Sequence, residues 1–286
     1  YDTSYHVDGV GRFRVNILKQ KSKFAAVLRV IPSKVPTLDE LQLPAVLKKV
    51  AAEERGLVLV TGVTGSGKST TLAAMITEIN AATRKHIVTI EDPIEFVHED
   101  KLSRVTQREV GVDTESFAMA LRAALRQDPD VILVGEMRDA ITIDTGLKAA
   151  ETGHLVFSTV HTNDAAKTIG RIIDVFPHDA QSAVRQRLAD NLKATISQRL
   201  LRRQDGQGRV VAMEIMVSTL SVREMIKDPG RTWEIKDYIE RSRDMYGTQS
   251  FDQHLIELYQ GGVISLETAK AAATNPADLE RALYLS

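Results

Sequence analysis

The stretch Gly62-Val63-Thr64-Gly65-Ser66-Gly67-Lys68-Ser69 decides the fold of this chain. It follows an apolar, β-rich run from Gly56 to Thr61 and leads into a helical pattern from about Thr70 to Ala81. The spacing G-x-x-x-x-G-K-S between a strand and a helix is typical of a loop that binds nucleotide phosphates. Its glycines let successive backbone N–H groups point inward, and the following helix adds its positive end.

The side chains of this loop have distinct expected roles. Lys68 should reach the β- and γ-phosphates, and the Ser69 hydroxyl should bind Mg²⁺. The nucleotide-contacting set is predicted to be Gly62, Thr64, Gly65, Ser66, Gly67, Lys68, Ser69 and Thr70. A glycine-rich turn before an ordinary helix is the competing interpretation, and it does not explain why strand, spacing and helix occur together.

Composition narrows the class of protein. The chain has 286 residues, a formal net charge of −1 and no cysteine, and this length suits about two domains. Near-neutral charge argues against nucleic acid as the main partner, because such binding needs a concentrated basic surface. Without cysteine there is no disulfide framework, which fits a reducing cytosol. No apolar run approaches the roughly 20 residues of a membrane span, so a role at a membrane would require docking and no direct insertion.

Residues 1–32 alternate in a β-like way, with candidate strands at Val10–Ile17 and Phe24–Ile31. Two strands bury too little surface to form a domain. We therefore interpret this segment as the last strands of an N-terminal domain that begins before the sequence. Residues 33–55 are predicted to be a linker and a short helix, which the capping box at Thr37–Glu40 would open.

Residues 56–216 are predicted to form an α/β core. Apolar runs at Leu57–Val60, His86–Ile90, Val131–Val134 and Leu155–Thr159 alternate with helical patterns, and this alternation indicates a mostly parallel sheet wrapped by helices. Chemistry is then expected at the carboxyl ends of the strands. Residues 217–286 have a polar helical pattern and are predicted to be a small all-helical subdomain.

Carboxylates follow two of these strands. The run Val131–Val134 leads to Glu136, in the position of a group that supports a metal ion or orients water. The run His86–Ile90 leads to three carboxylates within five residues, Glu91, Asp92 and Glu95. Such crowding is costly unless a cation or a proton-transfer role offsets the repulsion, so one of them is expected to polarise water. A solvated acidic turn stiffened by Pro93 is the alternative.

Two histidines, His154 and His161, flank the run Leu155–Thr159. An imidazole at the end of a strand can sense a γ-phosphate, because it donates and accepts hydrogen bonds at neutral pH. A structural role is the alternative for each of them. A zinc site is not expected, because no further ligands occur at metal spacing.

Together these motifs resemble the type II/type IV secretion ATPase superfamily, most closely its PilT/PilU branch of type IV pilus motors. The resemblance covers almost the whole chain. It extends over 11–16, 62–69, 89–95, 130–139, 152–161 and 249–253. It implies a RecA-like P-loop NTPase core, the final strands of a partial PAS-like N-terminal domain, and hydrolysis of ATP with Mg²⁺.

The resemblance also implies roles for single residues. Lys68 and Ser69 would hold phosphates and Mg²⁺, and Glu136 would support the metal through a water molecule. Glu95 or Glu91 would be the general base. His161, with His154 second, would lie near the γ-phosphate.

Proteins of this family work as a ring of six, in which arginines reach across from a neighbouring subunit. Arg12 and Arg14 match the position of such trans-acting arginines, and Arg122, Arg126 and Arg138 are further candidates. An arginine of this kind is worth about 10³–10⁵ in rate. Surface salt bridges are the alternative interpretation for each of these arginines.

Two features place the chain within the superfamily. Extension and secretion motors usually carry a tetracysteine zinc insertion, and the absence of cysteine favours a retraction motor. Retraction motors typically show Ala-Ile-Arg-Asn-Leu-Ile in the helical subdomain, where this chain has Ser221-Val222-Arg223-Glu224-Met225-Ile226. An accessory or paralogous motor therefore stays an alternative, as does a pilus-extension or type II secretion ATPase.

The leading hypothesis is a hexameric ATPase that powers type IV pilus retraction, and thereby pilin disassembly and twitching motility. It would be cytoplasmic, peripheral to the inner membrane, with the inner-membrane platform protein and a paralogous motor as partners. A nucleotide-gated scaffold with little hydrolysis is a second hypothesis. A DNA-translocating motor is a third, and it would need a basic path interleaved with aromatic residues, which the sequence lacks.

Overall fold

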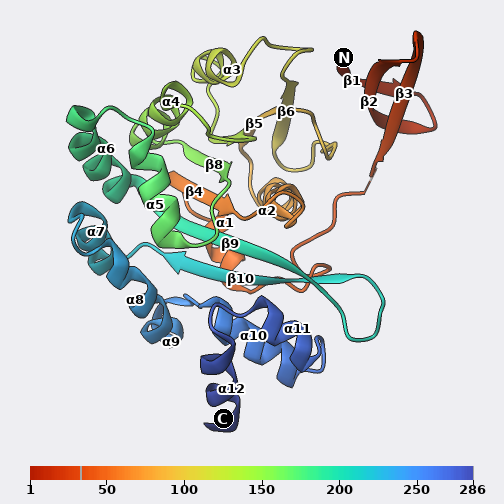
Figure 1. Ribbon diagram of the computed structural model, residues 1–286. Helices are drawn as coiled ribbons and strands as arrows, with labels where there is room; N and C mark the ends of the chain where they lie inside the picture. Colours follow the sequence, from red (N-terminus) through yellow and green to blue (C-terminus); the bar gives the residue numbers. More distant parts are fainter. Residues whose placement is uncertain (33, 286) are drawn as a thin grey trace.

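The structure, a computed structural model, describes every residue except Ser33 and Ser286 (Figure 1). Two positions of the predicted domains therefore lie outside the described residues: Ser33 of the linker and Ser286 at the end of the helical subdomain. The strands are β1 (Asp2–Val7), β2 (Gly11–Gln20), β3 (Lys23–Ile31), β4 (Gly56–Thr61), β5 (His86–Glu91), β6 (Arg104–Glu109), β7 (Val131–Val134), β8 (Leu155–Val160), β9 (Leu192–Arg202) and β10 (Arg209–Val217).

Helices connect and cover these strands. They are α1 (Val46–Ala51), α2 (Lys68–Ala82), α3 (Phe117–Ala124), α4 (Ala140–Glu151), α5 (Ala165–Asp174), α6 (His178–Asn191), α7 (Leu220–Lys227), α8 (Ile235–Arg241), α9 (Arg243–Tyr246), α10 (Phe251–Gln260), α11 (Leu266–Ala272) and α12 (Pro276–Leu285), with a 3-10 turn at Thr232–Glu234.

The core is a seven-stranded sheet in the order β10-β9-β4-β8-β7-β5-β6. All neighbouring strands from β9 to β6 pair in parallel, and β10 pairs antiparallel with β9. The prediction of an α/β core with a mostly parallel sheet is confirmed. Because parallel strands need crossover helices, both faces of the sheet are covered (Figure 1).

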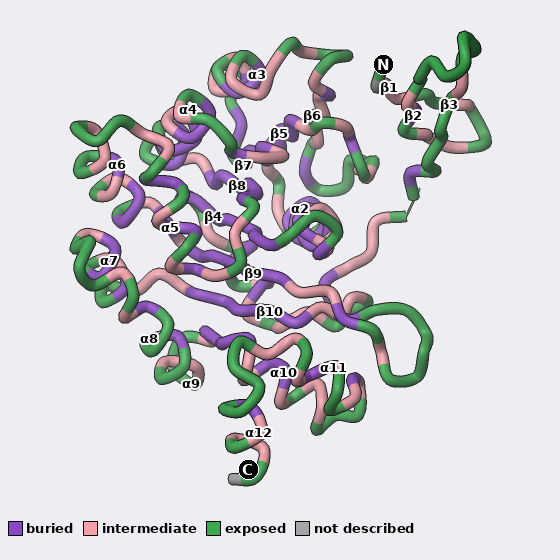
Figure 2. Tube along the Cα trace, viewed as in Figure 1, coloured by how far each residue is buried: buried purple, intermediate pink, exposed green. Residues whose placement is uncertain are grey.

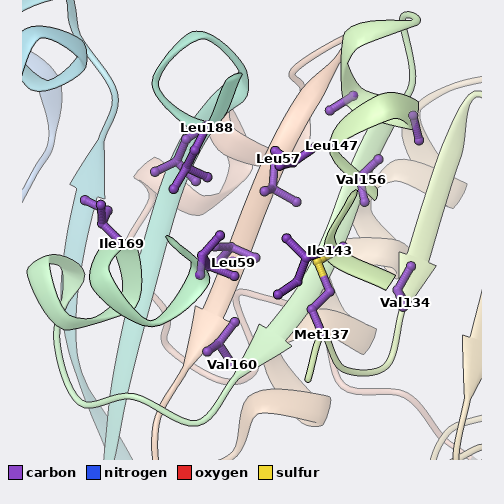
Figure 3. Close-up of a cluster of buried hydrophobic side chains, with 14 of the residues drawn as sticks. Leu57, Leu59, Val134, Met137, Ile143, Leu147, Val156, Val160, Ile169 and Leu188 are labelled. Carbon is purple, nitrogen blue, oxygen red and sulfur yellow. The ribbon is translucent and has the colours of Figure 1, made fainter. Parts of the chain in front are cut away.

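Strand β4 explains why the sheet lies in the middle of the core. All six of its residues are buried, and successive side chains point to opposite faces. Val58 and Val60 belong to the cluster that includes residues of α1 and α2. Leu57 and Leu59 belong to the cluster formed with α3 to α6, where Figure 3 shows them near Ile143 of α4.

The N-terminal segment forms a separate antiparallel sheet in the order β1-β2-β3. The candidate strands at Val10–Ile17 and Phe24–Ile31 correspond to β2 and β3, and β1 was not predicted. This sheet is mostly exposed, as its green and pink tube in Figure 2 shows, and large apolar side chains such as Phe24 are open to solvent.

The linker differs from the prediction in one respect. The capping-box hydrogen bonds form, because Thr37 N–H donates to Glu40 Oε2 at 2.9 Å and Glu40 N–H donates to Thr37 Oγ1 at 3.1 Å. They close a turn and not a helix, and the helix begins later, at Val46. Pro44 lies between the two, and a proline disfavours the helical conformation of the residue before it.

The C-terminal part is helical, as predicted. Helices α10, α11 and α12 pack a small apolar cluster against β9 and β10, with Phe251, Leu255 and Leu279 at its centre. Helices α7 and α8 join the main cluster beside α5 and α6. Among the helices of the described residues, none is long and apolar enough to cross a lipid bilayer.

Candidate active site

The strand order brings the predicted site residues together. The phosphate loop follows β4, His161 follows β8, Glu136 follows β7, and Glu91 ends β5. Because β4, β8, β7 and β5 lie side by side in that order, their carboxyl ends form one edge of the sheet. Ligands bind at this edge in open parallel sheets.

The phosphate loop is compact where glycine is required. Gly62 has φ +143°, and a Cβ atom there would lie 2.5 Å from Ser66 Oγ and 2.7 Å from the carbonyl oxygen of Gln198. Gly67, with φ +92°, immediately precedes α2. The loop therefore turns tightly and places its backbone N–H groups next to the positive end of α2, where both favour an anion.

Lys68 lies inside this loop. Its Nζ donates to the carbonyl oxygens of Gly62 at 2.9 Å and Val63 at 3.1 Å. Burial lowers the pKa of Lys68, and the charges of Glu136 and Glu95 raise it again. Both predicted carboxylates therefore act on the lysine of the loop, although they come from different strands.

The loop fits a polyphosphate bound with a hard cation. Ser66 Oγ is buried and has no hydrogen-bond partner among the described residues, so it is a donor available to a ligand. Ser69 and Thr70 are partly exposed at the start of α2, and Thr64 is exposed on the loop. Hydroxyl and carboxylate oxygens are the ligands that Mg²⁺ prefers, and Ser69 and Glu136 supply them.

Glu136 forms a cluster with His161 and Arg138. Its Oε2 lies 2.6 Å from Arg138 Nε and 3.7 Å from His161 Nε2. Burial lowers the pKa of His161, Lys68 lowers it further, and Glu136 opposes both. The net direction is downward from 6.5, so the imidazole is neutral at pH 7 and can both donate and accept.

The acid loop, residues 92–98 after β5, carries Glu95. Glu91, at the end of β5, accepts from Thr89 Oγ1 at 2.7 Å and from Gln107 Nε2 at 3.1 Å. Burial raises the pKa of Glu91, and these hydrogen bonds, with one from the Glu95 backbone, oppose that rise. Glu91 is thus fixed in place, whereas Glu95 is exposed.

The N-terminal arginines lie beside the acid loop. Arg12 Nη2 donates to Glu109 Oε2 at 2.7 Å, an ion pair within one chain. Arg14 lines a small hollow of about 30 Å³ together with Asp92, Pro93 and Glu109. The sheet β1–β3 therefore contacts the core next to the acids.

Other predicted residues lie away from the phosphate loop. His154 precedes β8 whereas His161 follows it, and a six-residue strand separates them by roughly 20 Å. His154 Nδ1 instead lies 2.9 Å from the carbonyl oxygen of Ala149, so the structure does not bring His154 to the loop. Arg122, on α3, and Arg126, just after it, are exposed.

Sequence reasoning missed three polar residues around the site. Gln107 and Glu109 reach the acid loop from β6, an edge strand with a polar sequence. Glu214, on β10, accepts from the Ala165 N–H at 2.8 Å, at the start of the helix that follows His161. Residues Arg104–Glu109 have no apolar face, so no apolar run in the sequence indicated a strand there.

These features define a class of protein: a P-loop nucleoside triphosphatase with a RecA-like core, in which the acid loop lies at the same end of the sheet as the phosphate loop. Residues 7–275 match the family model described as "Type II/IV secretion system protein". The chain belongs to that family.

Relatives within the family are close. The chain is 51% identical over 274 residues to the "Twitching motility protein" of Neisseria gonorrhoeae, covering 96% of this chain and 73% of the relative. It is 52% identical over 275 residues to the "Type IV pilus retractation ATPase PilT" of Pseudomonas aeruginosa, covering 96% and 79%. The crystal structure of "the Pilus Retraction Motor PilT and Bound ADP" superposes with a TM-score of 0.90 at 49% identity, covering 98% and 79%.

Proposed function

We propose that this chain hydrolyses ATP as a subunit of the motor that retracts type IV pili. The observation that carries the proposal is a phosphate loop that shares one end of the sheet with Glu136 and the acid loop, in a chain about half identical to a pilus retraction ATPase. Retraction disassembles pilin and produces twitching motility.

The loop from Gly62 to Thr70 binds the phosphates. Its backbone N–H groups, Ser66 Oγ and Lys68 Nζ face the charge of the triphosphate, and Lys68 exchanges its two carbonyl partners for phosphate oxygens. Ser69, and Glu136 through water, would hold Mg²⁺, which when bound neutralises charge on the phosphates.

Glu95 is the general base in this proposal. A base must reach the water that attacks the γ-phosphate in line, and Glu95 is the exposed acid whose charge acts on Lys68. Glu91 orients the loop beneath it. His161, neutral and close to Glu136, donates a hydrogen bond towards the γ-phosphate and so reports its presence to strand β8.

Arginines complete the site in a ring of six. Arg138 lies next to Glu136 with 70% of its side chain exposed, and Arg14 lies at the hollow beside Asp92. Arg122, on α3, and Arg126, just after it, are exposed. One of Arg14, Arg122, Arg126 and Arg138 supplies the positive charge that a neighbouring subunit needs in its transition state.

The motor works in the cytoplasm at the inner membrane. A pilus platform protein in that membrane receives the movement of the ring, and a paralogous motor is a further partner. The departure at Ser221–Ile226, in α7, supports an accessory role as the alternative. Complementation of a strain that lacks its retraction ATPase separates the two, because an independent motor restores twitching motility by itself.

Replacement of Lys68 tests the enzymatic part. Lys68→Ala should abolish phosphate release from ATP, because the loop loses its one buried cation, while the circular dichroism spectrum stays unchanged. Lys49→Ala is the matched control, since Lys49 is exposed on α1, and it should keep full turnover. Turnover by Lys68→Ala at the unmodified rate contradicts the proposal, and nucleotide binding by the unmodified chain without turnover supports the scaffold hypothesis.

A further inference from the structure

Side chains on one face of strand β6 form hydrogen bonds with the acid loop. Gln107 and Glu109 are two residues apart, so their side chains point to the same face. Gln107 Nε2 donates to the Phe96 carbonyl oxygen at 2.9 Å, and Gln107 Oε1 accepts from the His98 N–H at 2.8 Å. Glu109 Oε2 accepts from the Ile94 N–H at 3.1 Å. The loop that bears Glu95 is therefore attached on both sides of that residue.

Glu109 differs from Gln107 because it also contacts the N-terminal sheet. Its side chain is only 2% exposed, and the same oxygen that accepts from Ile94 accepts from Arg12 Nη2. A buried carboxylate is costly without a positive partner. Among the described residues, Arg12 is the cation in salt-bridge contact with it.

The contact of Arg12 is suited to being made and lost. Both of its hydrogen bonds to described residues start from Nη2, one to Glu109 and one to Ser4 Oγ at 2.8 Å. Its Nε is buried and has no hydrogen-bond partner in the described part of the chain. The pair thus lacks the two-bond geometry that makes arginine–carboxylate pairs strong.

We propose that Glu109 is a positioning residue for hydrolysis, which transmits the position of the N-terminal sheet to the acid loop. With Arg12 in contact, the positive charge of its guanidinium balances the charge of Glu109. Glu109 then holds the backbone N–H of Ile94, one residue before Glu95. When the sheet moves away, Glu109 becomes a buried charge without a cation, and the acid loop shifts with it. The inference rests on the proposed function in taking Glu95 as the base.

A double-mutant cycle tests this coupling. Glu109→Gln keeps an oxygen for the Ile94 N–H but has no charge for Arg12. It should lower kcat by about 10- to 100-fold, the cost of misplacing a reacting group by about 1 Å, with KM for ATP unchanged. Arg12→Ala should cause a similar loss, and the double variant should lose nothing more, because both changes break the same contact. Glu115→Gln, on an exposed neighbour, is the control and should keep full activity.

Arg12→Lys separates positioning from direct chemistry. Because the contact uses a single nitrogen, a lysine should retain most of kcat, whereas an arginine that clamps a neighbour's phosphates tolerates lysine poorly. Losses that multiply in the double variant, or unchanged kcat in Glu109→Gln, overturn the proposal.

Hydrogen exchange gives a readout that does not depend on turnover. Residues 92–98 should exchange faster in Glu109→Gln and in Arg12→Ala, to the same extent, while β4 exchanges as before. Arg12 lies on the N-terminal sheet outside the main core, so its variants remain informative if Glu109→Gln fails to fold. If the unmodified chain does not hydrolyse ATP, the proposed function fails, and unchanged exchange in both variants separately overturns the coupling.

Discussion

Glu214 is a buried carboxyl that supports the segment after β8. Its pKa is raised from 4.5 to about 7, mainly by burial, and the hydrogen bond from Ala165 N–H opposes the rise. Between these two values the folded protein holds a proton that the unfolded chain has released. The free energy of unfolding therefore falls as pH rises through this window.

The substitution Glu214→Gln should remove this pH dependence. The difference between 4.5 and about 7 corresponds to about 3 kcal/mol, so the variant should be more stable than the unmodified protein by up to that amount at pH 8. At pH 5 the two should differ little. Urea unfolding at both pH values measures the effect, and an equal stability difference at both would show that Glu214 is not the titrating group.

Single residues also show where sequence reasoning stops. His154 and His161 look alike in the sequence because both flank one strand, yet only His161 lies beside Glu136. Which end of β8 lies beside the phosphate loop depends on whether β8 runs parallel or antiparallel to β4. Once β8 is known to run parallel to β4, the residue after each strand belongs to the site and the residue before it does not.

At the level of elements, the phosphate loop gives a prediction that compares two glycines. Gly62→Ala should destabilise the nucleotide-free protein more than Gly65→Ala. Gly65 has φ +79° but nothing within 4 Å of a built Cβ, so alanine there costs only about 1–2 kcal/mol for the left-handed backbone. At Gly62 the backbone oxygen of Gln198 would also be displaced.

Melting temperatures without nucleotide, with ATP turnover in parallel, test this comparison. We expect the lower melting temperature and the larger loss of turnover in Gly62→Ala. A Gly65→Ala protein that melts at or below Gly62→Ala would show that the contact with Gln198 does not constrain the loop.

The strands β4, β5, β7 and β8 were predictable from the sequence, whereas β6, β9 and β10 were not predicted. Strands β4, β5, β7 and β8 are buried on both faces and stand out as apolar runs. Strand β6, Arg104–Glu109, lies at the edge of the sheet, where only one neighbour pairs with it and polar side chains are allowed. Gln107 and Glu109, which hold the acid loop, were missed because they lie on that strand.

At the scale of the whole molecule, the proposed ring makes turnover depend on assembly. ATP hydrolysis per subunit should rise with protein concentration and level off as the ring of six forms, because arginines from a neighbour complete each site. Phosphate release measured across a dilution series, with light scattering for mass, tests this expectation. A monomer that hydrolyses ATP at the full rate would contradict it.

The edge position of β6 separates nucleotide binding from the control of turnover. A marginal strand can change its side chains without disturbing the centre of the sheet, and this one touches both the N-terminal sheet and the acids but not the phosphate loop. Nucleotide binding and the rate of hydrolysis thus depend on different parts of the chain, the phosphate loop and the edge strand. Substitutions on β6 should therefore alter the rate of hydrolysis while the affinity for nucleotide stays the same.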